Sequence, residues 1–211
     1  MLDLERTVKE ILARQERIPA SRALLVGISG IDGSGKGWVA ARLESALRAA
    51  GETPVCINVD GWLNLPARRF DPHHPAEHFY EHALRLEEAF SRVILPLRDT
   101  RSCDLVADFA EETSTEFGRR HYRFDRVSVI LFEGIFLFKR QFRRHFDLGC
   151  WVECTFETAL ERAMRRGQEH LPKDETVRAY ETIYFPAQRI HFERDEPRSS
   201  ADMLISNDLR L

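Results

Sequence analysis

The sequence predicts a three-layer α/β/α fold, in which helices cover both faces of a mainly parallel, five-stranded sheet. Several short segments are continuously apolar, which is typical of strands buried on both faces of a parallel sheet. Segments with apolar residues at helical spacing separate these runs, and such alternation favours parallel strands joined by right-handed crossovers. The expected strands comprise residues 23–29, 54–60, 127–134, 148–154 and 201–206.

Helices are expected between these strands, where apolar side chains recur three and four residues apart. One of them has a predicted apolar face formed by Phe79, Ala83, Leu86 and Phe90. Pro186 is expected to kink or interrupt the last helix, because proline lacks a backbone N–H. The other predicted helices comprise residues 2–17, 36–50, 138–145, 156–166 and the segment that begins at Asp174.

Residues 98–126 form the least regular part of the chain. Alternation within residues 120–124 predicts a short strand, which would be half of an exposed hairpin beside the main sheet. Arg119 and Arg120 either belong to its solvated surface or contact an anionic acceptor. On the preceding predicted helix, a solvated face is favoured over a metal-binding stripe for the histidines spaced four apart, which are His74, His78 and His82.

The composition is that of an ordinary globular protein, with 211 residues of which 43% are hydrophobic and 31% charged. The formal net charge is −3, so the chain lacks the positive field that would favour nucleic acid as a partner. No apolar leader or membrane-spanning run is present, so we expect no membrane partner and a cytoplasmic location. The four cysteines form no C-x-x-C pair and are expected to be reduced thiols.

Residues 30–36, Gly-Ile-Asp-Gly-Ser-Gly-Lys, match the phosphate-loop (P-loop) pattern G-x-x-x-x-G-K between a predicted strand and a predicted helix. Glycines let the backbone curl so that successive N–H groups surround an anion, and the following helix presents its positive end. Lys36 would reach the outer phosphates of a bound polyphosphate. The residues expected to bind a nucleotide are Gly30, Asp32, Gly33, Ser34, Gly35, Lys36, Gly37 and Trp38.

Gly37 departs from the usual pattern, because Ser or Thr normally follows the lysine and supplies a hydroxyl to Mg²⁺. Ser34 lies inside the loop and does not obviously replace that hydroxyl. Two explanations stay open. Either the metal is held through water and other side chains, or metal use is impaired.

Two predicted strands end in a carboxylate, at Asp60 and Glu133. In open α/β sheets ligands bind beyond the carboxyl ends of the strands, so both side chains should lie at the edge that carries the P-loop. Either residue alone would be interpreted as a turn residue. Beside a P-loop, Asp60 becomes a candidate catalytic base or metal ligand, and Glu133 becomes a candidate ligand of Mg²⁺.

The predicted helix over 156–166 carries three arginines just before Gly167. Guanidinium groups donate two parallel hydrogen bonds to phosphate oxygens, so this helix suits a lid that closes on a transferring phosphate. Favourable interaction of cations with the helix dipole would explain one or two of these arginines. Arg162 and Arg166 are the favoured catalytic candidates.

Together these segments resemble the uridine kinase and phosphoribulokinase family of P-loop small-molecule kinases. The resemblance extends from residue 23 to residue 207 and rests on segments 27–36, 59–62, 131–136, 162–166, 184–188 and 201–205. It implies ATP-dependent phosphorylation of a hydroxyl on a small acceptor. In this family pattern Lys36 holds phosphates, Asp60 accepts the hydroxyl proton, Glu133 helps to place Mg²⁺, and the lid arginines neutralise charge.

The resemblance is weakest between residues 61 and 126, so the acceptor stays open among a nucleoside, pantothenate, a sugar phosphate and other compounds. The family's ribose-binding carboxylate has two candidates here, Asp71 and Glu81. We expect residues 1–211 to form one kinase domain, with an acceptor-side insertion at about 61–126 and a lid at about 162–175.

A non-catalytic nucleotide-binding protein with a degenerate P-loop is the alternative, because of Gly37. A hydrolytic NTPase switch fits less well, since it would leave Asp60 and the arginine lid without a task. Formation of a homo-oligomer and the choice between ATP and GTP also stay open.

Overall fold

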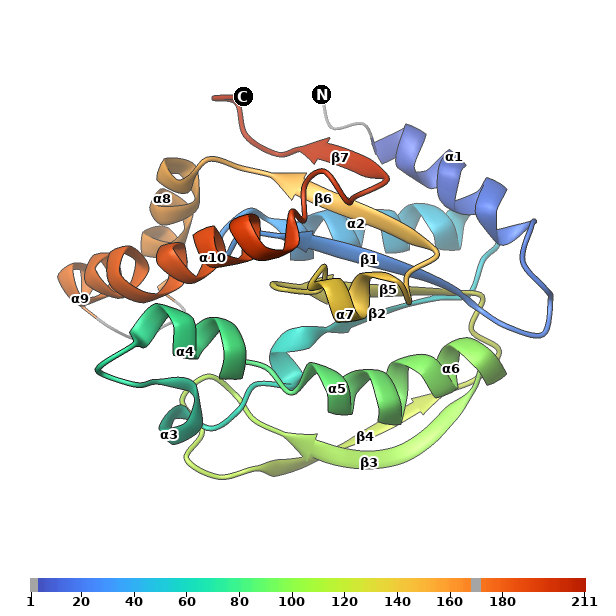
Figure 1. The fold of residues 1–211 in the computed structure, drawn as a ribbon. Coiled ribbons are helices and arrows are strands. Elements are labelled where there is room, and N and C mark those ends of the chain that lie inside the picture. The colour runs from blue at the N-terminus through green and yellow to red at the C-terminus, as the bar shows by residue number, and fades with distance from the viewer. Residues whose placement is uncertain (1–3, 168–171) are drawn as a thin grey trace.

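The computed structural model describes residues 4–167 and 172–211. Its centre is a five-stranded, fully parallel sheet with the strand order β2-β5-β1-β6-β7 (Figure 1). This architecture confirms the predicted three-layer α/β/α class. The strands are β1 (Leu24–Gly30), β2 (Pro54–Asn58), β5 (Val129–Gly134), β6 (Leu148–Glu153) and β7 (Met203–Ser206).

The central strand β1 pairs with β5 on one side and with β6 on the other. Ile28 of β1 lies opposite Glu133 of β5, and Asn58 of β2 also lies opposite Glu133. The chain therefore fills one half of the sheet before β6 and β7 fill the other. Ligands of such sheets bind beyond the carboxyl ends of the strands, near the strand where the order reverses.

Successive residues of each strand pack into different layers, as the pleat requires. Leu24 and Val26 belong to an apolar cluster with α1 (Leu4–Gln15) and α2 (Lys36–Ala49), whereas Leu25 belongs to a second cluster on the opposite face. Figure 1 shows α1 and α2 on one side of the sheet and α7 and α10 on the other. The helices that contribute to the second cluster are α4 (Pro75–His82), α5 (Leu86–Ala89), α6 (Leu95–Thr100), α7 (Arg140–Arg143), α8 (Phe156–Arg166), α9 (Lys173–Ala179) and α10 (Phe185–Asp195).

Two helices of the second layer contain a π-helical turn, at Phe90–Ile94 and at Tyr180–Tyr184. Each π turn is followed two residues later by a proline, Pro96 or Pro186. A proline ring clashes with the carbonyl four residues earlier, and a wider turn is one way to accommodate it. The expected interruption at Pro186 is thus a local widening of a helix that continues into α10.

Three sequence-based boundaries were wrong. β2 ends at Asn58, and residues Val59–Gly61 form a 3₁₀ turn instead of the end of a strand. The helix expected through residues 79–90 is broken between α4 and α5, where Leu84 pairs with Leu63. This pairing with a distant segment outweighs the helical spacing of the apolar residues. The helix expected at 138–145 is reduced to the four residues of α7.

The predicted hairpin is present as a separate antiparallel sheet of β3 (Cys103–Phe109) and β4 (Gly118–Phe124). It lies beside α5 and α6 in Figure 1, below the main sheet. Trp62 joins the hairpin to the rest of the structure, because it bridges to Ala110 and stacks on Tyr122 at 5.7 Å between ring centroids. The short helix α3 (Pro66–Arg69) follows Trp62 and faces the same hairpin loop, where Arg69 bonds to a backbone carbonyl.

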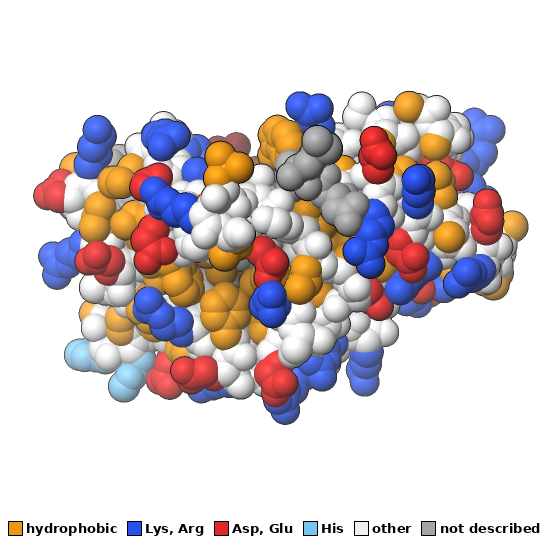
Figure 2. Space-filling view, turned by 90° about the horizontal axis from the view of Figure 1, so that it is seen from above, with side chains coloured by type: hydrophobic (Ala, Val, Ile, Leu, Met, Phe, Trp, Pro, Cys, Tyr) orange, Lys and Arg blue, Asp and Glu red, His pale blue; other side chains and the backbone are white. Residues whose placement is uncertain are grey.

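The surface carries charges of both signs. Figure 2 shows basic and acidic side chains interspersed over one face of the molecule. Within residues 4–167 and 172–211, no helix has both the length and the apolar character needed to cross a membrane.

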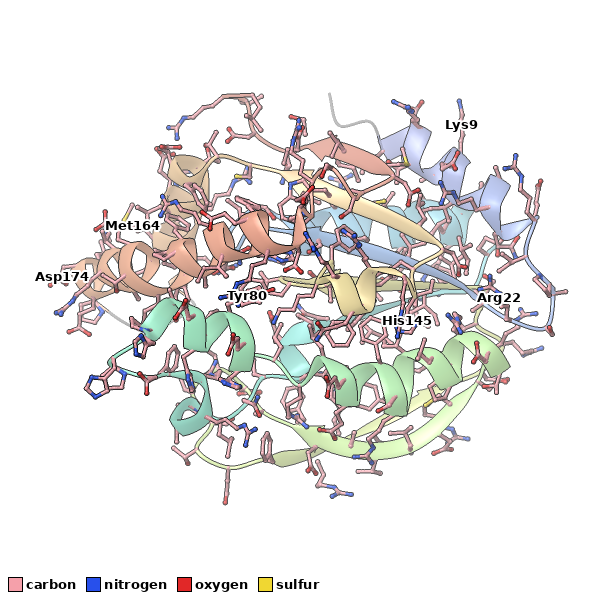
Figure 3. The ribbon with its side chains drawn as sticks, in the orientation of Figure 1. Lys9, Arg22, Tyr80, His145, Met164 and Asp174 are labelled. Carbon is pink, nitrogen blue, oxygen red and sulfur yellow. The ribbon has the colours of Figure 1, made fainter. Side chains whose placement is uncertain are left out.

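A buried polar cluster holds three helices together beneath α10. The Asp195 carboxylate accepts hydrogen bonds from Tyr80 Oη at 2.5 Å, from His191 Nδ1 at 2.7 Å and from the backbone N–H of Arg140 at 3.0 Å. Figure 3 shows Tyr80 between α4 and α10. Burial alone would raise the pKa of Asp195, but the bonds from His191, Tyr80 and Arg140 lower this pKa to about 2.

Replacing Asp195 with Asn should destabilise the protein by about 2–4 kcal/mol at pH 7. The amide nitrogen is itself a donor, so it would face either the backbone N–H of Arg140 or the side-chain donors of Tyr80 and His191. The donors that it faces would lose their acceptor. The free energy of unfolding in urea tests this prediction. Because the pKa of Asp195 is lowered, its stabilising effect should be present above about pH 4 and should be lost as the pH falls towards 2.

Glu193→Gln is the matched control, because Glu193 is exposed on the same helix. This variant should change stability by less than about 0.5 kcal/mol. Equal stabilities of the two variants would contradict a structural role for the Asp195 cluster.

Candidate active site

The P-loop is a tight turn that only glycine accommodates at two positions. Gly33 and Gly35 have φ angles of 76° and 85°, in the left-handed region. A Cβ atom at Gly33 would lie 2.6 Å from the backbone oxygen of Ala159, and one at Gly35 would lie 2.2 Å from the Asn207 side chain. The loop is therefore pressed against α8 and against the residue that follows β7.

Two side chains hold the loop from its outer side. Arg162 Nη1 donates to the carbonyl oxygen of Ser34 at 3.1 Å, and Arg162 Nη2 donates to that of Asn207 at 2.7 Å. Asn207 Nδ2 also donates to the Ser34 carbonyl, at 2.7 Å. These bonds fix the carbonyl side of the loop and tie it to α8 and β7.

A cavity of about 590 Å³ opens at the carboxyl ends of β1, β2 and β5. Most of the predicted site residues meet there, from the P-loop, the strand ends and α8. The predicted residues that line this cavity are Asp32, Gly33, Gly35, Lys36, Gly37, Trp38, Asp60, Glu133 and Arg166. Three others lie outside it, namely Gly30, Ser34 and Arg162. Ser34 is fully buried and does not line the cavity, whereas Gly37 does, so the Ser34 hydroxyl does not replace a hydroxyl at residue 37.

Glu133 stands at the end of β5 and is 4% exposed. Burial, together with the nearby charge of Asp60, raises its pKa to about 7, although Lys36 and a hydrogen bond with Asn58 act in the opposite direction. A Cβ atom added at Gly37 would lie 3.5 Å from Glu133 Oε1. A side chain at residue 37 would therefore lie in contact with this carboxylate.

Asp60 belongs to the 3₁₀ turn after β2 and is exposed on the cavity wall. Its backbone N–H donates to Asn58 Oδ1 at 2.5 Å, which fixes the turn. Desolvation within the cavity and the charge of Asp32 raise the pKa of Asp60, against the effect of Lys36. Protons are thus held more tightly at Asp60 and Glu133 than at ordinary carboxylates.

Asp32 links the P-loop to α8 and to the π-helical turn at Tyr180–Tyr184. Its carboxylate accepts a hydrogen bond from the Tyr180 hydroxyl and lies 3.6 Å from Arg166 Nη2. Burial would raise the pKa of Asp32, but the charges of Lys36 and Arg166 and the bond from Tyr180 lower it. The predicted lid at 162–175 includes residues 168–171, which lie outside the described residues.

The far wall of the cavity combines apolar and polar groups from α3, α4, the hairpin and α10. Phe79, Phe109 and Tyr184 supply rings, and Arg69 and Gln188 supply polar side chains. Arg69, Gln188 and Tyr180 are not among the residues predicted for the site from the sequence. Arg69 stands in the irregular segment after Asp60, whereas Tyr180 and Gln188 occur in helical segments that read as structural.

Asp71 and Glu81, the candidates for a ribose-binding carboxylate, do not line this cavity. Asp71 Oδ1 accepts from the backbone N–H groups of His73 at 2.8 Å and His74 at 2.9 Å, in the turn that precedes α4. Glu81 Oε1 accepts from Arg194 Nη1 at 3.3 Å on the surface.

The carboxylates that line the cavity suit Mg²⁺ only in combination with other ligands. Within the described parts of the chain, no group of three or more His, Cys, Asp or Glu side chains is arranged to hold a metal ion. Mg²⁺ commonly uses one or two protein carboxylates and completes its shell with water and substrate phosphates. Glu133 and Asp60, beside the open space at Gly37, fit that kind of site.

In the absence of nucleotide and metal, Glu133→Gln should stabilise the protein increasingly as the pH rises from 5 to 8. The raised pKa of Glu133 means that its protonated form favours the folded state at low pH, and that this contribution is lost as the pH rises towards about 7. The difference in stability between variant and wild type should grow by on the order of 2 kcal/mol over this range. Thermal unfolding at pH 5, 6, 7 and 8 measures it, with the exposed Glu87→Gln as control. A difference independent of pH would contradict the raised pKa.

No family model matches the sequence, but solved structures do. The chain is similar to the structure of a possible uridine kinase from Bacillus stearothermophilus, with 21% identity, a TM-score of 0.73 and coverage of 95% of this chain and 96% of that chain. A candidate fructose transport system kinase from Silicibacter sp. TM1040 also gives 21% identity and a TM-score of 0.73, covering 97% and 99% of the two chains. D-glycerate 3-kinase from Cryptococcus neoformans var. grubii gives 12% identity and a TM-score of 0.61, with 92% and 88% covered.

At these identities the likeness concerns the fold, and it extends over nearly the whole length of each chain. The predicted resemblance to uridine-kinase-like P-loop kinases is confirmed at this level. The chain has the fold of a P-loop kinase.

Proposed function

We propose that this protein is an ATP-dependent, uridine-kinase-like phosphotransferase that phosphorylates a hydroxyl group of a small metabolite with the help of Mg²⁺. One observation carries the proposal. A single cavity is lined by a P-loop with its lysine, by the carboxylates of Asp60 in the turn after β2 and of Glu133 in β5, and by Arg166 of α8. Phosphoryl transfer requires mainly alignment and charge stabilisation, and these groups supply both.

The P-loop would bind the β- and γ-phosphates of ATP through its backbone N–H groups and the positive end of α2. Lys36, whose Nζ lies 3.4 Å from the Ile31 carbonyl, would extend along these phosphates. Arg166 lines the cavity beside Asp32 and would neutralise charge that develops on the transferred group. Arg162 would act as a positioning residue, because its bonds to Ser34 and Asn207 hold the loop in shape.

Asp60 is the proposed general base. In the transfer step the acceptor oxygen bonds to the γ-phosphorus, the bond from that phosphorus to the bridging oxygen of ADP breaks, and the hydroxyl proton passes to Asp60. A base is most effective when its pKa lies near the working pH, so the raised pKa of Asp60 favours this role.

Glu133 and Asp60 would hold Mg²⁺, directly or through water. When bound, the metal ion neutralises phosphate charge and helps to align the transferred group. Gly37 contributes no hydroxyl, so Glu133 would have a larger share in metal binding here than in P-loops with Ser or Thr at this position.

The proteins that share this fold include a possible uridine kinase, a candidate fructose transport system kinase and a D-glycerate 3-kinase, so we expect a small hydroxylated acceptor here. We propose that residues 61–126 supply the acceptor side of the site and that residues 162–175 act as its lid. Phe79, Phe109 and Arg69 on the far wall of the cavity support the first of these assignments.

Asp60→Asn should lower kcat by about 10²- to 10⁴-fold, because an amide cannot accept the proton. ATP affinity should stay within a few-fold of the wild type. ADP release in the presence of Mg²⁺ and a panel of hydroxylated metabolites measures the first quantity, and calorimetry measures the second.

Asp104→Asn provides the control, since Asp104 lies exposed on the hairpin outside the cavity. An unchanged kcat in Asp60→Asn would remove Asp60 from the mechanism. Tight ATP binding that is indifferent to Mg²⁺, without turnover of any acceptor, would instead favour a non-catalytic nucleotide-binding protein. Rapid ATP hydrolysis without an acceptor would indicate an NTPase switch.

Gly37→Ser should lower the Mg²⁺ concentration needed for half-maximal ATP turnover by about tenfold, because it adds a metal-directed hydroxyl beside Glu133. A Cβ atom fits there in ordinary van der Waals contact, so the fold should tolerate the change. Gly37→Ala adds the Cβ atom without the hydroxyl and should leave the Mg²⁺ requirement unchanged. An equal decrease in the Mg²⁺ requirement of both variants would show that the hydroxyl is not responsible for the decrease.

A further inference from the structure

Arg69 is a buried cation on the wall of the cavity. It is 2% exposed, whereas its neighbour Arg68 on the same helix is exposed. The Arg69 side chain lies among groups of the far wall, with its Cζ 5.1 Å from the centroid of the Phe70 ring. Arginine is seldom buried unless its charge has a partner.

Some of the hydrogen-bond donors of the Arg69 guanidinium have no acceptor among the described residues. Among the described residues, the only hydrogen-bond acceptor for this side chain is the backbone carbonyl of Glu112, which takes a bond from Nη2. The buried Nε–H has no partner there. The bond to the Glu112 carbonyl uses one of the five N–H donors of the guanidinium. It does not explain why this charged group lies on the wall of a cavity.

A second unsatisfied group lies in the same cavity. Gln188 of α10 is 1% exposed, and its buried Oε1 has no hydrogen-bond partner among the residues of the described chain. Buried polar atoms are nearly always paired, so each exception needs an explanation. An unpaired donor and an unpaired acceptor in one cavity indicate a ligand that carries both an acceptor group and a hydroxyl.

Charge narrows the class of that ligand. Burial lowers the pKa of Arg69, and the charges of Glu112 and Asp60 raise it, but a guanidinium stays protonated at neutral pH in any case. Arg120 of β4 adds a second cation at the cavity, with its Cζ 5.0 Å from the centroid of the Phe109 ring. A neutral acceptor would leave the buried charge of Arg69 without a ligand partner, whereas a carboxylate or phosphate would match its planar donors.

Resting on the kinase function proposed above, we propose that the acceptor is a hydroxylated anion. Arg69 binds its carboxylate or phosphate group, Arg120 assists from the hairpin, and Gln188 accepts a hydrogen bond from a hydroxyl. The hydroxyl to be phosphorylated then lies towards Asp60, which is close enough to influence Arg69 electrostatically. Arg69 is thus the residue that distinguishes anionic from neutral acceptors.

Matched pairs of probes test this inference. D-glycerate with glycerol gives the carboxylate arm, ribose 5-phosphate with ribose gives the phosphate arm, and uridine serves as a neutral nucleoside. Calorimetry measures the affinity of each probe for the wild-type protein, which is first saturated with ADP and Mg²⁺. A separate assay measures ATP turnover with each probe. The anionic member of at least one pair should bind at least about tenfold more tightly than its neutral partner.

Arg69→Met should abolish that preference, and Arg68→Met should retain it. Both variants remove one positive charge from the same helix, so a difference between them isolates the buried guanidinium. Arg69→Lys should restore part of the preference, because it keeps the charge without the planar donors. Arg69→Met should also unfold at a temperature no lower than the wild type, since it removes a buried and incompletely bonded cation.

The outcomes separate the two proposals. Turnover of a neutral probe with equal efficiency, unaffected by Arg69→Met, would overturn the inference and leave the kinase function in place. Anion-selective binding that depends on Arg69, without turnover of any probe, would support the inference and count against the kinase function. Binding of no anionic probe, or an anion preference that survives in Arg69→Met, would overturn the inference.

Discussion

The pairing of β1 with β5 is the constraint on which the rest of the site depends. It sets Ile28, two residues before the P-loop, opposite Glu133 at the end of β5. Since parallel strands end at the same edge, this register forces a ring of backbone amides and a carboxylate into one space. β2 pairs with the other side of β5, and the turn after it brings Asp60 to the same place.

This arrangement brings several charged groups into one cavity. Asp32, Asp60 and Glu133 all interact with Lys36, and the environment pushes their pKa values in different directions. Lys36, Arg166 and the bond from Tyr180 lower the pKa of Asp32, whereas desolvation raises the pKa values of Glu133 and Asp60. Such a difference in pKa between neighbouring carboxylates is characteristic of sites in which these carboxylates have different roles.

The C-terminal third of the chain holds the P-loop from two sides. Arg162 and Asn207 bind its Ser34 carbonyl from outside, whereas Tyr180 and Arg166 contact the Asp32 carboxylate. Movement of α8 would therefore act on both the shape of the loop and the charge at its rim. The Thr155 cap and the Asp208 carboxylate, which accepts from Thr155 Oγ1 at 2.7 Å, anchor the start of this helix.

Local sequence determined the layer architecture, the P-loop and the edge at which Asp60 and Glu133 lie, because apolar runs, glycine pattern and strand direction are properties of short segments. Tertiary packing decided the rest. Arg162 and Arg166 stand four residues apart on one helix, and only the position of α8 sends the first to the outside of the loop and the second to the cavity.

In the same way, Arg69 and not Arg68 is buried, because Arg69 bonds to the Glu112 carbonyl of the hairpin loop. The pairing of Leu63 with Leu84 ends a helix that the spacing of apolar residues alone would continue. Contacts between segments that are distant in sequence determine which arginine is buried and where the helix ends, and no local sequence pattern predicts either.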